Sequence, residues 1–124
     1  MNRGGPLAKV SKAKAAANRQ QQRAYRVVEA GACYCQTCGA TGPLDHSHIL
    51  TQKAYPQHAA NPLNIWLECR FTCHASWEND KQQYATDHPE AFAAKLAIIQ
   101  QLEPQAHAFF LMKNEWARRL LGGG

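Results

Sequence analysis

Four cysteines in two close pairs carry the most specific chemistry in this sequence. Cys35 and Cys38 are separated by two residues, and Cys69 and Cys73 by three. Two such pairs are typical of a closed, tetrahedral zinc site, because each short turn presents two thiolates to one metal ion. We therefore predict a structural Zn2+ held by these four cysteines. Pairing of Cys35 with Cys38 is preferred because of its spacing, which leaves Cys33 over, with a buried structural role expected for it.

Side chains with nitrogen or oxygen donor atoms, which are harder metal ligands than thiolates, lie between and after the cysteine pairs. Asp45, His46 and His48 fall in one short segment, and His74 and Glu78 follow the last cysteine. Imidazoles and carboxylates hold catalytic divalent metals such as Mg2+, Mn2+, Ni2+ or Zn2+, which activate or polarise substrates. His74 and Glu78 are four residues apart and would share one face of a helix. Together with Asp45 or His46 they would form a second, open metal site.

The elements that must position these residues can be read from periodicity and from Pro and Gly positions. Pro56 and Pro62 indicate a loop between two short strands, in which His58 is expected to be solvated. Trp77 and Tyr84 are expected to pack inward, because aromatic residues at helical spacing usually belong to the core. The predicted strands span about 44–50 and 64–68, and the predicted helices about 7–30, 72–86, 88–102 and 104–120.

Basic residues are concentrated at the start of the chain. The net charge of the whole chain is +5, whereas residues 1–30 carry seven basic side chains and one acidic side chain, a net charge of +6. A basic arm on a nearly neutral body suggests a polyanionic partner, most simply nucleic acid, although a solubilising tail would have the same charge. We expect six of these side chains to contact nucleic acid: Lys9, Lys12, Lys14, Arg19, Arg23 and Arg26.

Length and composition indicate one small globular domain. The chain has 124 residues, of which 45% are hydrophobic and 19% charged. It contains no apolar run of about 18 residues and no signal peptide, so we expect no membrane partner and a cytoplasmic location, where paired cysteines usually bind metal. We divide it into a basic arm or helix (1–30), a zinc-stabilised core (31–88) and a C-terminal helical hairpin (89–124).

These motifs resemble those of a known family, the HNH nucleases of the ββα-metal fold. The order that carries the resemblance is a cysteine pair, a histidine-bearing strand, Asn64-Ile65 at the next strand, and a second cysteine pair that ends in Cys73-His74, all within about 35–78. Cys69 and Cys73 have three residues between them, whereas members of that family usually have two. The resemblance implies an α+β fold with a treble-clef-like core, metal-dependent cleavage of DNA, and a structural role for Asn64, which would hold the loop that bears the general base.

Two segments narrow the resemblance further. The run from His48 to Pro56, followed by Asn64, is similar to phage recombination nucleases of the NinG type. The run Leu44-Asp45-His46, two residues before His48, is similar to phage endonucleases that cut branched DNA. The resemblance therefore implies a phage-encoded enzyme acting in recombination, replication or packaging, within the host cytoplasm.

Phosphodiester hydrolysis needs a water nucleophile, a base that deprotonates it, and positive charge at the leaving oxygen. A histidine suits the base. Either Asp45 is a ligand and His46 the base, or His48 is the base and Asp45 or His46 is a ligand; we favour His48.

Two functions from different classes thus follow from the sequence: a metal-dependent endonuclease, and a non-catalytic zinc module that binds nucleic acid. The retained His48, Asn64, His74 and Glu78 favour the enzyme, because a binding module needs only the four cysteines. The sequence leaves the oligomeric state open between monomer and homodimer.

Overall fold

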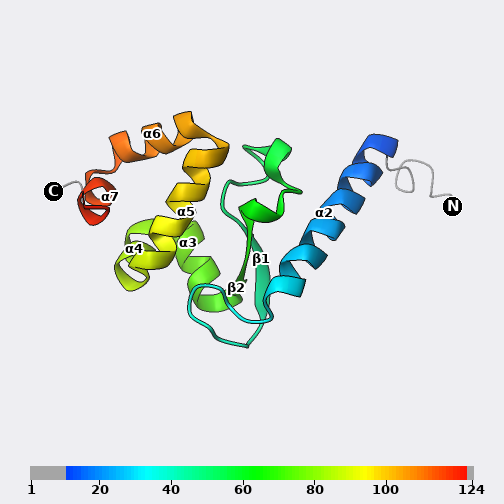
Figure 1. Ribbon diagram of the computed structural model, residues 1–124, viewed down its shortest axis with the longest axis horizontal. Helices are drawn as coiled ribbons and strands as arrows, with labels where there is room; N and C mark the ends of the chain where they lie inside the picture. The colour runs from blue at the N-terminus through cyan, green and yellow to red at the C-terminus, as the bar shows by residue number, and fades with distance from the viewer. Residues whose placement is uncertain (1–10, 123–124) are drawn as a thin grey trace, which may run out of the picture.

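The computed structural model of the chain describes residues 11–122. At its centre, β1 (Leu44–His48) pairs with β2 (Ile65–Cys69) in a two-stranded antiparallel sheet. The register places Leu44 opposite Cys69 and His48 opposite Ile65. One helix lies on one side of this sheet and the remaining helices lie on the other (Figure 1). The predicted mixed α+β class is therefore confirmed.

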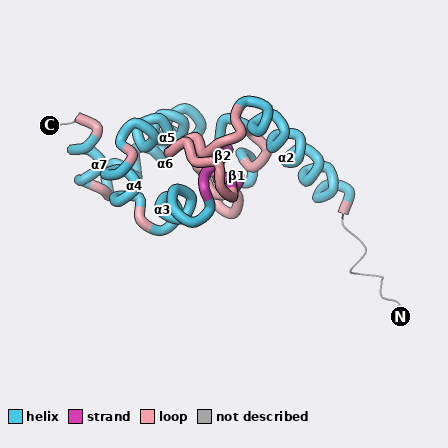
Figure 2. The backbone as a smooth tube through the Cα atoms, turned by 90° about the horizontal axis from the view of Figure 1, so that it is seen from below, coloured by secondary structure: helices cyan, strands magenta, loops and turns pink. Residues whose placement is uncertain are grey.

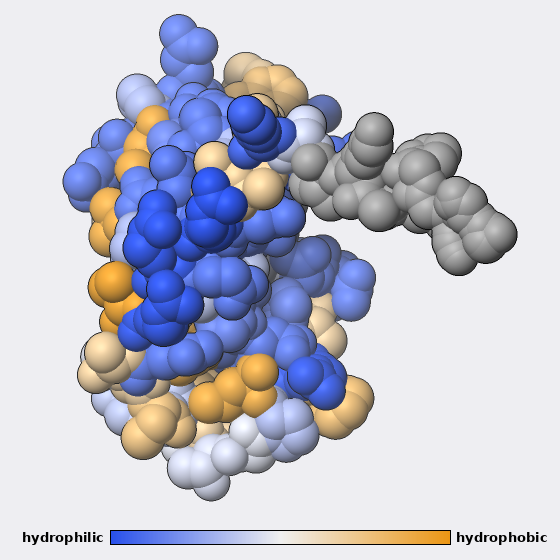
Figure 3. All heavy atoms as spheres, turned by 90° about the vertical axis from the view of Figure 1, so that its right-hand side faces the viewer, coloured by the Kyte–Doolittle hydropathy of each residue, from blue (hydrophilic) through white to orange (hydrophobic). Residues whose placement is uncertain are grey.

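Helix α2 (Lys12–Gly31) forms the outer side of the molecule, and its N-terminal end projects away from the sheet (Figure 2). Its residues are mostly good helix formers, and the Ser11 hydroxyl caps it by accepting from the Lys14 amide at 3.1 Å. Among its residues Ala24 alone is buried, so the helix rests on a narrow stripe. The side of the molecule that carries α2 is covered mainly by hydrophilic side chains (Figure 3). The first residues of the predicted helix lie outside the described residues.

The helix predicted for 72–86 is interrupted. A π-helical turn, η3 (Arg70–His74), leads into α3 (Ala75–Asn79), and α4 (Lys81–Asp87) starts afresh after Asp80. The Asp80 carboxylate accepts a hydrogen bond from the Gln83 amide at 3.1 Å. An aspartate that satisfies a free N–H group in this way stabilises a new helix start. The prediction of one continuous helix was therefore wrong because it overlooked this cap.

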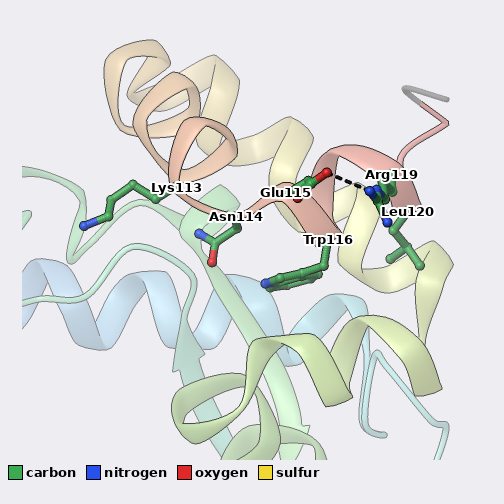
Figure 4. Close-up of a pocket in the computed structure, with 6 residues that line it drawn as sticks. All are labelled: Lys113, Asn114, Glu115, Trp116, Arg119 and Leu120. Atoms are coloured by element: carbon green, nitrogen blue, oxygen red, sulfur yellow. Dashed lines mark hydrogen bonds and ion pairs between the residues drawn. The ribbon is translucent and has the colours of Figure 1, made fainter.

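The C-terminal part contains α5 (Pro89–Leu102), α6 (Pro104–Lys113) and α7 (Glu115–Leu120), of which α5 and α6 lie side by side (Figure 1). The last predicted helix is divided at Asn114 (Figure 4). The Asn114 side chain donates to the Phe110 carbonyl at 2.8 Å and so competes with the helical hydrogen bonds. Phe109 and Met112 of α6 are 57% and 65% exposed and therefore lie outside the core.

The core lies between the sheet and these helices. Trp77, Tyr84, Phe92 and Leu96 are buried, as predicted for the first two. Phe92 from α5 also packs against Trp116 of α7, with ring centroids 5.6 Å apart. No helix within residues 11–122 combines the length and the apolar character needed to cross a membrane.

A buried ion pair, not foreseen from the sequence, joins β2 to α5. Lys95 Nζ lies 2.7 Å from Glu68 Oε1, and both side chains are fully buried. The other carboxylate oxygen accepts from the hydroxyls of Thr37, at 2.5 Å, and Tyr84, at 3.0 Å. Burial lowers the pKa of Lys95 to about 8 despite the nearby carboxylate. Burial opposes ionisation of Glu68, but Lys95 outweighs it and lowers the pKa of that carboxyl group.

Candidate active site and metal centre

The four predicted zinc ligands meet at one point beside the sheet. The sulfur atoms of Cys35, Cys38, Cys69 and Cys73 all lie within 4.8 Å of one another, and those of Cys38 and Cys69 are 3.7 Å apart. Zinc–sulfur bonds of about 2.3 Å in a tetrahedron require sulfur–sulfur distances of about 3.8 Å. The cluster can therefore hold a metal ion and suits zinc. Cys33 lies outside it and is exposed, so its predicted burial was wrong.

Two turns build this cluster. In the first, the Cys38 amide donates to Cys35 Sγ at 3.4 Å, and Gly39 follows with a φ of +84°, which only glycine adopts without strain. In the second, the Cys73 amide donates to Cys69 Sγ at 3.5 Å. The additional residue of the second pair falls in the π-helical turn η3, which accommodates one extra residue in a helix. The longer spacing thus still brings Cys73 into the cluster.

The environment of the cluster favours the thiolate form of Cys69. Burial opposes ionisation of Cys69, but hydrogen bonds with the Thr72 hydroxyl, 2.7 Å away, and the Cys73 amide lower its pKa to about 6. Burial raises the pKa of Cys73. His88 Nε2 lies 3.9 Å from Cys73 Sγ, so this histidine contacts the cluster. A bound cation would stabilise the thiolate form of every ligand.

A second site lies beside β1 and the helix that follows the second cysteine pair. A cavity of about 190 Å³ is lined by His46 and His48 from β1, Thr51 and Gln52 from the following turn, and His74 and Glu78. The two strand histidines point to the same side because alternate strand residues share a face. The structure therefore brings together four of the predicted active-site residues: His46, His48, His74 and Glu78.

His48 is held in one tautomer. Its Nε2 lies 2.9 Å from the Ala59 carbonyl, which can only accept, so Nε2 carries the proton and Nδ1 is the ring nitrogen that carries a lone pair. Gln52 Nε2 lies 3.3 Å from that Nδ1. His48 is only 7% exposed, and this burial lowers its pKa. The imidazole is therefore neutral at pH 7, the form that can accept a proton.

Asn64 joins the two ends of the loop that follows His48. It is fully buried, its Oδ1 accepts from the Leu50 amide at 2.8 Å, and its Nδ2 donates to the carbonyls of Leu50 at 3.0 Å and His58 at 3.2 Å. These contacts are those expected of a residue that braces a loop. His58 itself, predicted to be solvated, is half-buried and lies with Nε2 2.7 Å from Glu103 Oε2.

Asp45 does not line the cavity. Its Oδ2 lies 2.8 Å from His74 Nδ1 and its Oδ1 2.9 Å from Arg70 Nε. Burial opposes ionisation, but these two partners lower the pKa of Asp45. Because the carboxylate accepts from Nδ1 of His74, the Nε2 of that ring keeps its lone pair. The structure thus places Asp45, which we predicted as a metal ligand, behind His74 and not on the wall of the cavity.

Helix α2 contributes contacts that the sequence analysis missed. Glu29 Oε2 lies 2.6 Å from His46 Nε2, and the Tyr25 ring stacks on the His46 ring with centroids 3.9 Å apart and an interplanar angle of 11°. Gln21 Nε2 donates to Tyr25 Oη and Gln52 Oε1, each at 2.8 Å. The signal that could have shown this is the spacing of Gln21, Tyr25 and Glu29 at four-residue intervals, with Glu29 the only acid in a basic segment.

The remaining predicted site residues lie along α2 or outside the described part. Lys12, Lys14, Arg19, Arg23 and Arg26 are all exposed on this helix. Lys9 lies outside the described residues.

The predicted catalytic metal ligands do not converge as the cysteines do. Within residues 11–122, the cysteine cluster is the one group of three or more histidine, cysteine or carboxylate ligands whose donor atoms lie within 4.8 Å of one another. His46, His74 and Glu78 instead surround the cavity. Two of them are imidazoles backed by carboxylates, an arrangement common at metal sites. The chain matches no family model, no curated protein and no solved structure.

Proposed function

We propose that this protein is a metal-dependent endonuclease of the HNH type that hydrolyses DNA phosphodiester bonds. The observation that carries the proposal is the cavity in which a neutral, tautomerically fixed His48 faces His74 and Glu78. A histidine buried in this form has no evident purpose in a module that only binds nucleic acid. A positioned base and a nearby set of metal donors are what phosphodiester hydrolysis requires.

In this mechanism Nδ1 of His48 accepts a proton from a water molecule as the water oxygen attacks phosphorus. The bond from phosphorus to the 3′ oxygen then breaks, and the leaving oxygen takes up a proton. Gln52, beside Nδ1, would orient the water. Asn64 keeps His48 in place by fixing the two ends of the loop that follows it, at Leu50 and His58. A positioned general base contributes about 10²–10⁴ in rate.

The donors around the cavity fit a divalent cation. His74, through Nε2, and His46, through Nδ1, are the ring nitrogens left unprotonated by their carboxylate partners, and Glu78 adds a negative charge. These three side chains would hold the ion, with Asp45 and Glu29 fixing the two rings. The ion would supply positive charge at the scissile phosphate and the leaving oxygen. The cysteine cluster would hold zinc with a purely structural role.

DNA is the favoured substrate because of the charge on α2. Lys12, Lys14, Arg19, Arg23 and Arg26 are exposed along one helix, so they can approach successive phosphates. Such contacts give affinity without sequence preference and depend strongly on salt.

One observation favours a second candidate, a zinc module that binds nucleic acid without cutting it: only the cysteines converge on a common point among residues 11–122. Incubation of the protein with linear, nicked and branched DNA, each with Mg2+, Mn2+, Ni2+, Zn2+ or EDTA, separates the two. The endonuclease gives metal-dependent products that disappear with EDTA and in His48→Ala. DNA binding without cleavage under every condition would leave the zinc module as the function.

A further inference from the structure

Helix α2 has two chemically different sides. Gln21, Tyr25 and Glu29 follow one another at four-residue intervals and therefore lie along one side of the helix. Each of them contacts a side chain that lines the cavity: Gln21 contacts Gln52, and Tyr25 and Glu29 contact His46. We call these three residues the inner face of α2.

The opposite side of α2 is basic. At about 100° of rotation per residue, Lys12, Arg19 and Arg23 fall about 120–180° away from Gln21 and Tyr25. All three are exposed, and we call them the outer face. Because a helix with its side chains is about 10 Å across, phosphates bound to the outer face cannot reach the cavity directly. The outer face therefore serves DNA binding, and the contacts of the inner face with the cavity have a different role.

The contacts of the inner face fix the geometry of His46. Tyr25 covers one face of the ring almost in parallel, at 11°, and so sets its plane. The Glu29 carboxylate accepts from Nε2 at 2.6 Å and so directs the lone pair of Nδ1 elsewhere, since a neutral imidazole carries one proton. A side chain held by two such partners has little freedom to leave the cavity.

The same face also reaches His48 through an intermediate. Gln21 Nε2 donates to Gln52 Oε1 at 2.8 Å, which fixes the orientation of the Gln52 amide. The amino group of Gln52 is thereby turned toward Nδ1 of His48, 3.3 Å away. Gln21 Nε2 also lies 3.4 Å from His48 Nε2, so both strand histidines contact α2 directly and His48 is connected to it through Gln52 as well.

We propose that the inner face of α2 is part of the catalytic centre, with Tyr25 and Glu29 as positioning residues for His46 and Gln21 as a positioning residue for Gln52. This inference rests on the proposed endonuclease function and assigns α2 a role beyond holding DNA. It is not a requirement for folding: Glu29 is 52% exposed at its side chain, and exposed ion pairs contribute little to stability.

The test compares the two faces with two substrates. DNA requires both binding and chemistry, whereas bis(p-nitrophenyl) phosphate is a small diester that cannot bridge several phosphate-binding residues. The inner-face variants are Glu29→Ala and Tyr25→Leu, with Tyr25→Phe as the conservative variant that keeps the ring. The outer-face variant is Arg19→Gln/Arg23→Gln, and Gln22→Ala, exposed on the same helix, is the neutral control. Zinc content and circular dichroism confirm folding of each.

We expect Glu29→Ala and Tyr25→Leu to lower kcat by about 10–100-fold on both substrates, as loss of a residue that orients a metal-binding histidine does. Their Kd for DNA should stay within about twofold of the parent, and Tyr25→Phe should retain most of the activity. The outer-face variant should raise the Kd for DNA, whereas Gln22→Ala should change neither the Kd for DNA nor the rate on the small diester.

The inference is overturned if the inner-face variants keep the parent rate on the small diester, or if they change only DNA affinity. If Tyr25→Leu does not fold, the rate of Glu29→Ala on the small diester decides whether the inference holds. A parent protein that binds DNA and hydrolyses neither substrate overturns the proposed function instead, which is a different result from an active parent with active inner-face variants.

Discussion

The Asp45 carboxylate accepts from Nδ1 of His74 at 2.8 Å, so the ring of His74 presents an unprotonated Nε2 on its other side. We predict that Asp45→Asn weakens the catalytic metal site by about 10–100-fold, because the amide can stabilise either tautomer of His74. Titration of cleavage against the divalent ion measures this change. Zinc in the cysteine cluster should remain at the parent level.

Arg70→Gln is the matched control for that variant. Arg70 contacts the other oxygen of Asp45 at 2.9 Å and is 53% exposed, so its loss leaves the contact between Asp45 and His74 in place. We expect at most a small shift in metal dependence. An equal effect of both substitutions would show that the local charge, and not the orientation of His74, matters.

Cleavage should persist below neutral pH. Burial lowers the pKa of His48 from its usual 6.5. The neutral imidazole is the active form, so the acid limb of the rate should have its midpoint below pH 6.5, where His48 becomes protonated. Initial rates from pH 4.5 to 8 at constant ionic strength measure the acid limb. A rate that still rises between pH 7 and 8 would argue against His48 as the base.

Removal of one cysteine ligand should abolish folding. We predict one tightly bound zinc per chain, and loss of both zinc and structure in Cys38→Ser, since apparent zinc-binding energies of about 10–16 kcal/mol are also folding energies in small domains. Elemental analysis and circular dichroism provide the readouts. Cys33→Ser is the control, because Cys33 is exposed and outside the cluster. A folded, zinc-free Cys38→Ser protein would refute the structural role of the metal.

Local sequence patterns predicted the metal cluster and the strand side of the cavity. The spacing of the cysteines fixes two turns, and the separation of His46 and His48 by one residue places both on the same face of a strand. The inward packing of Trp77 and Tyr84 follows equally from helical spacing. These features depend on residues that lie close together in sequence.

The features that were missed depend on distant partners or on side-chain hydrogen bonds. Nothing in the sequence around Asp45 distinguishes a metal ligand from a residue that binds His74. The contact between Glu29 and His46 joins residues 17 positions apart, and its formation depends on how α2 docks. The helix breaks at Asp80 and Asn114 arise from single side-chain hydrogen bonds, which outweigh a favourable hydrophobic period.

Removing one member of the buried ion pair of Lys95 and Glu68 should reduce stability more than removing both charges together. Lys95→Met leaves Glu68 charged and buried, which costs about 3–5 kcal/mol of unfolding free energy. The double variant Lys95→Met/Glu68→Gln should recover a large part of that loss. Denaturant unfolding at pH 7 measures both. Lys113→Met, at an exposed position, should change stability by no more than about 0.5 kcal/mol.

The last prediction concerns the basic side of α2. Replacing Lys12, Arg19 and Arg23 by Gln removes three exposed charges without touching a residue that lines the cavity. Each lost phosphate contact should reduce the slope of log K against log salt by about 0.9, so the triple variant should bind DNA more weakly and with a slope lower by about 2–3. Fluorescence anisotropy with one DNA duplex at several salt concentrations measures this slope. Substituting three surface lysines or arginines elsewhere, Lys53, Lys113 and Arg119, provides a variant of equal net charge. If that control lowers the slope equally, DNA binding follows the total charge of the protein and α2 is not the binding surface.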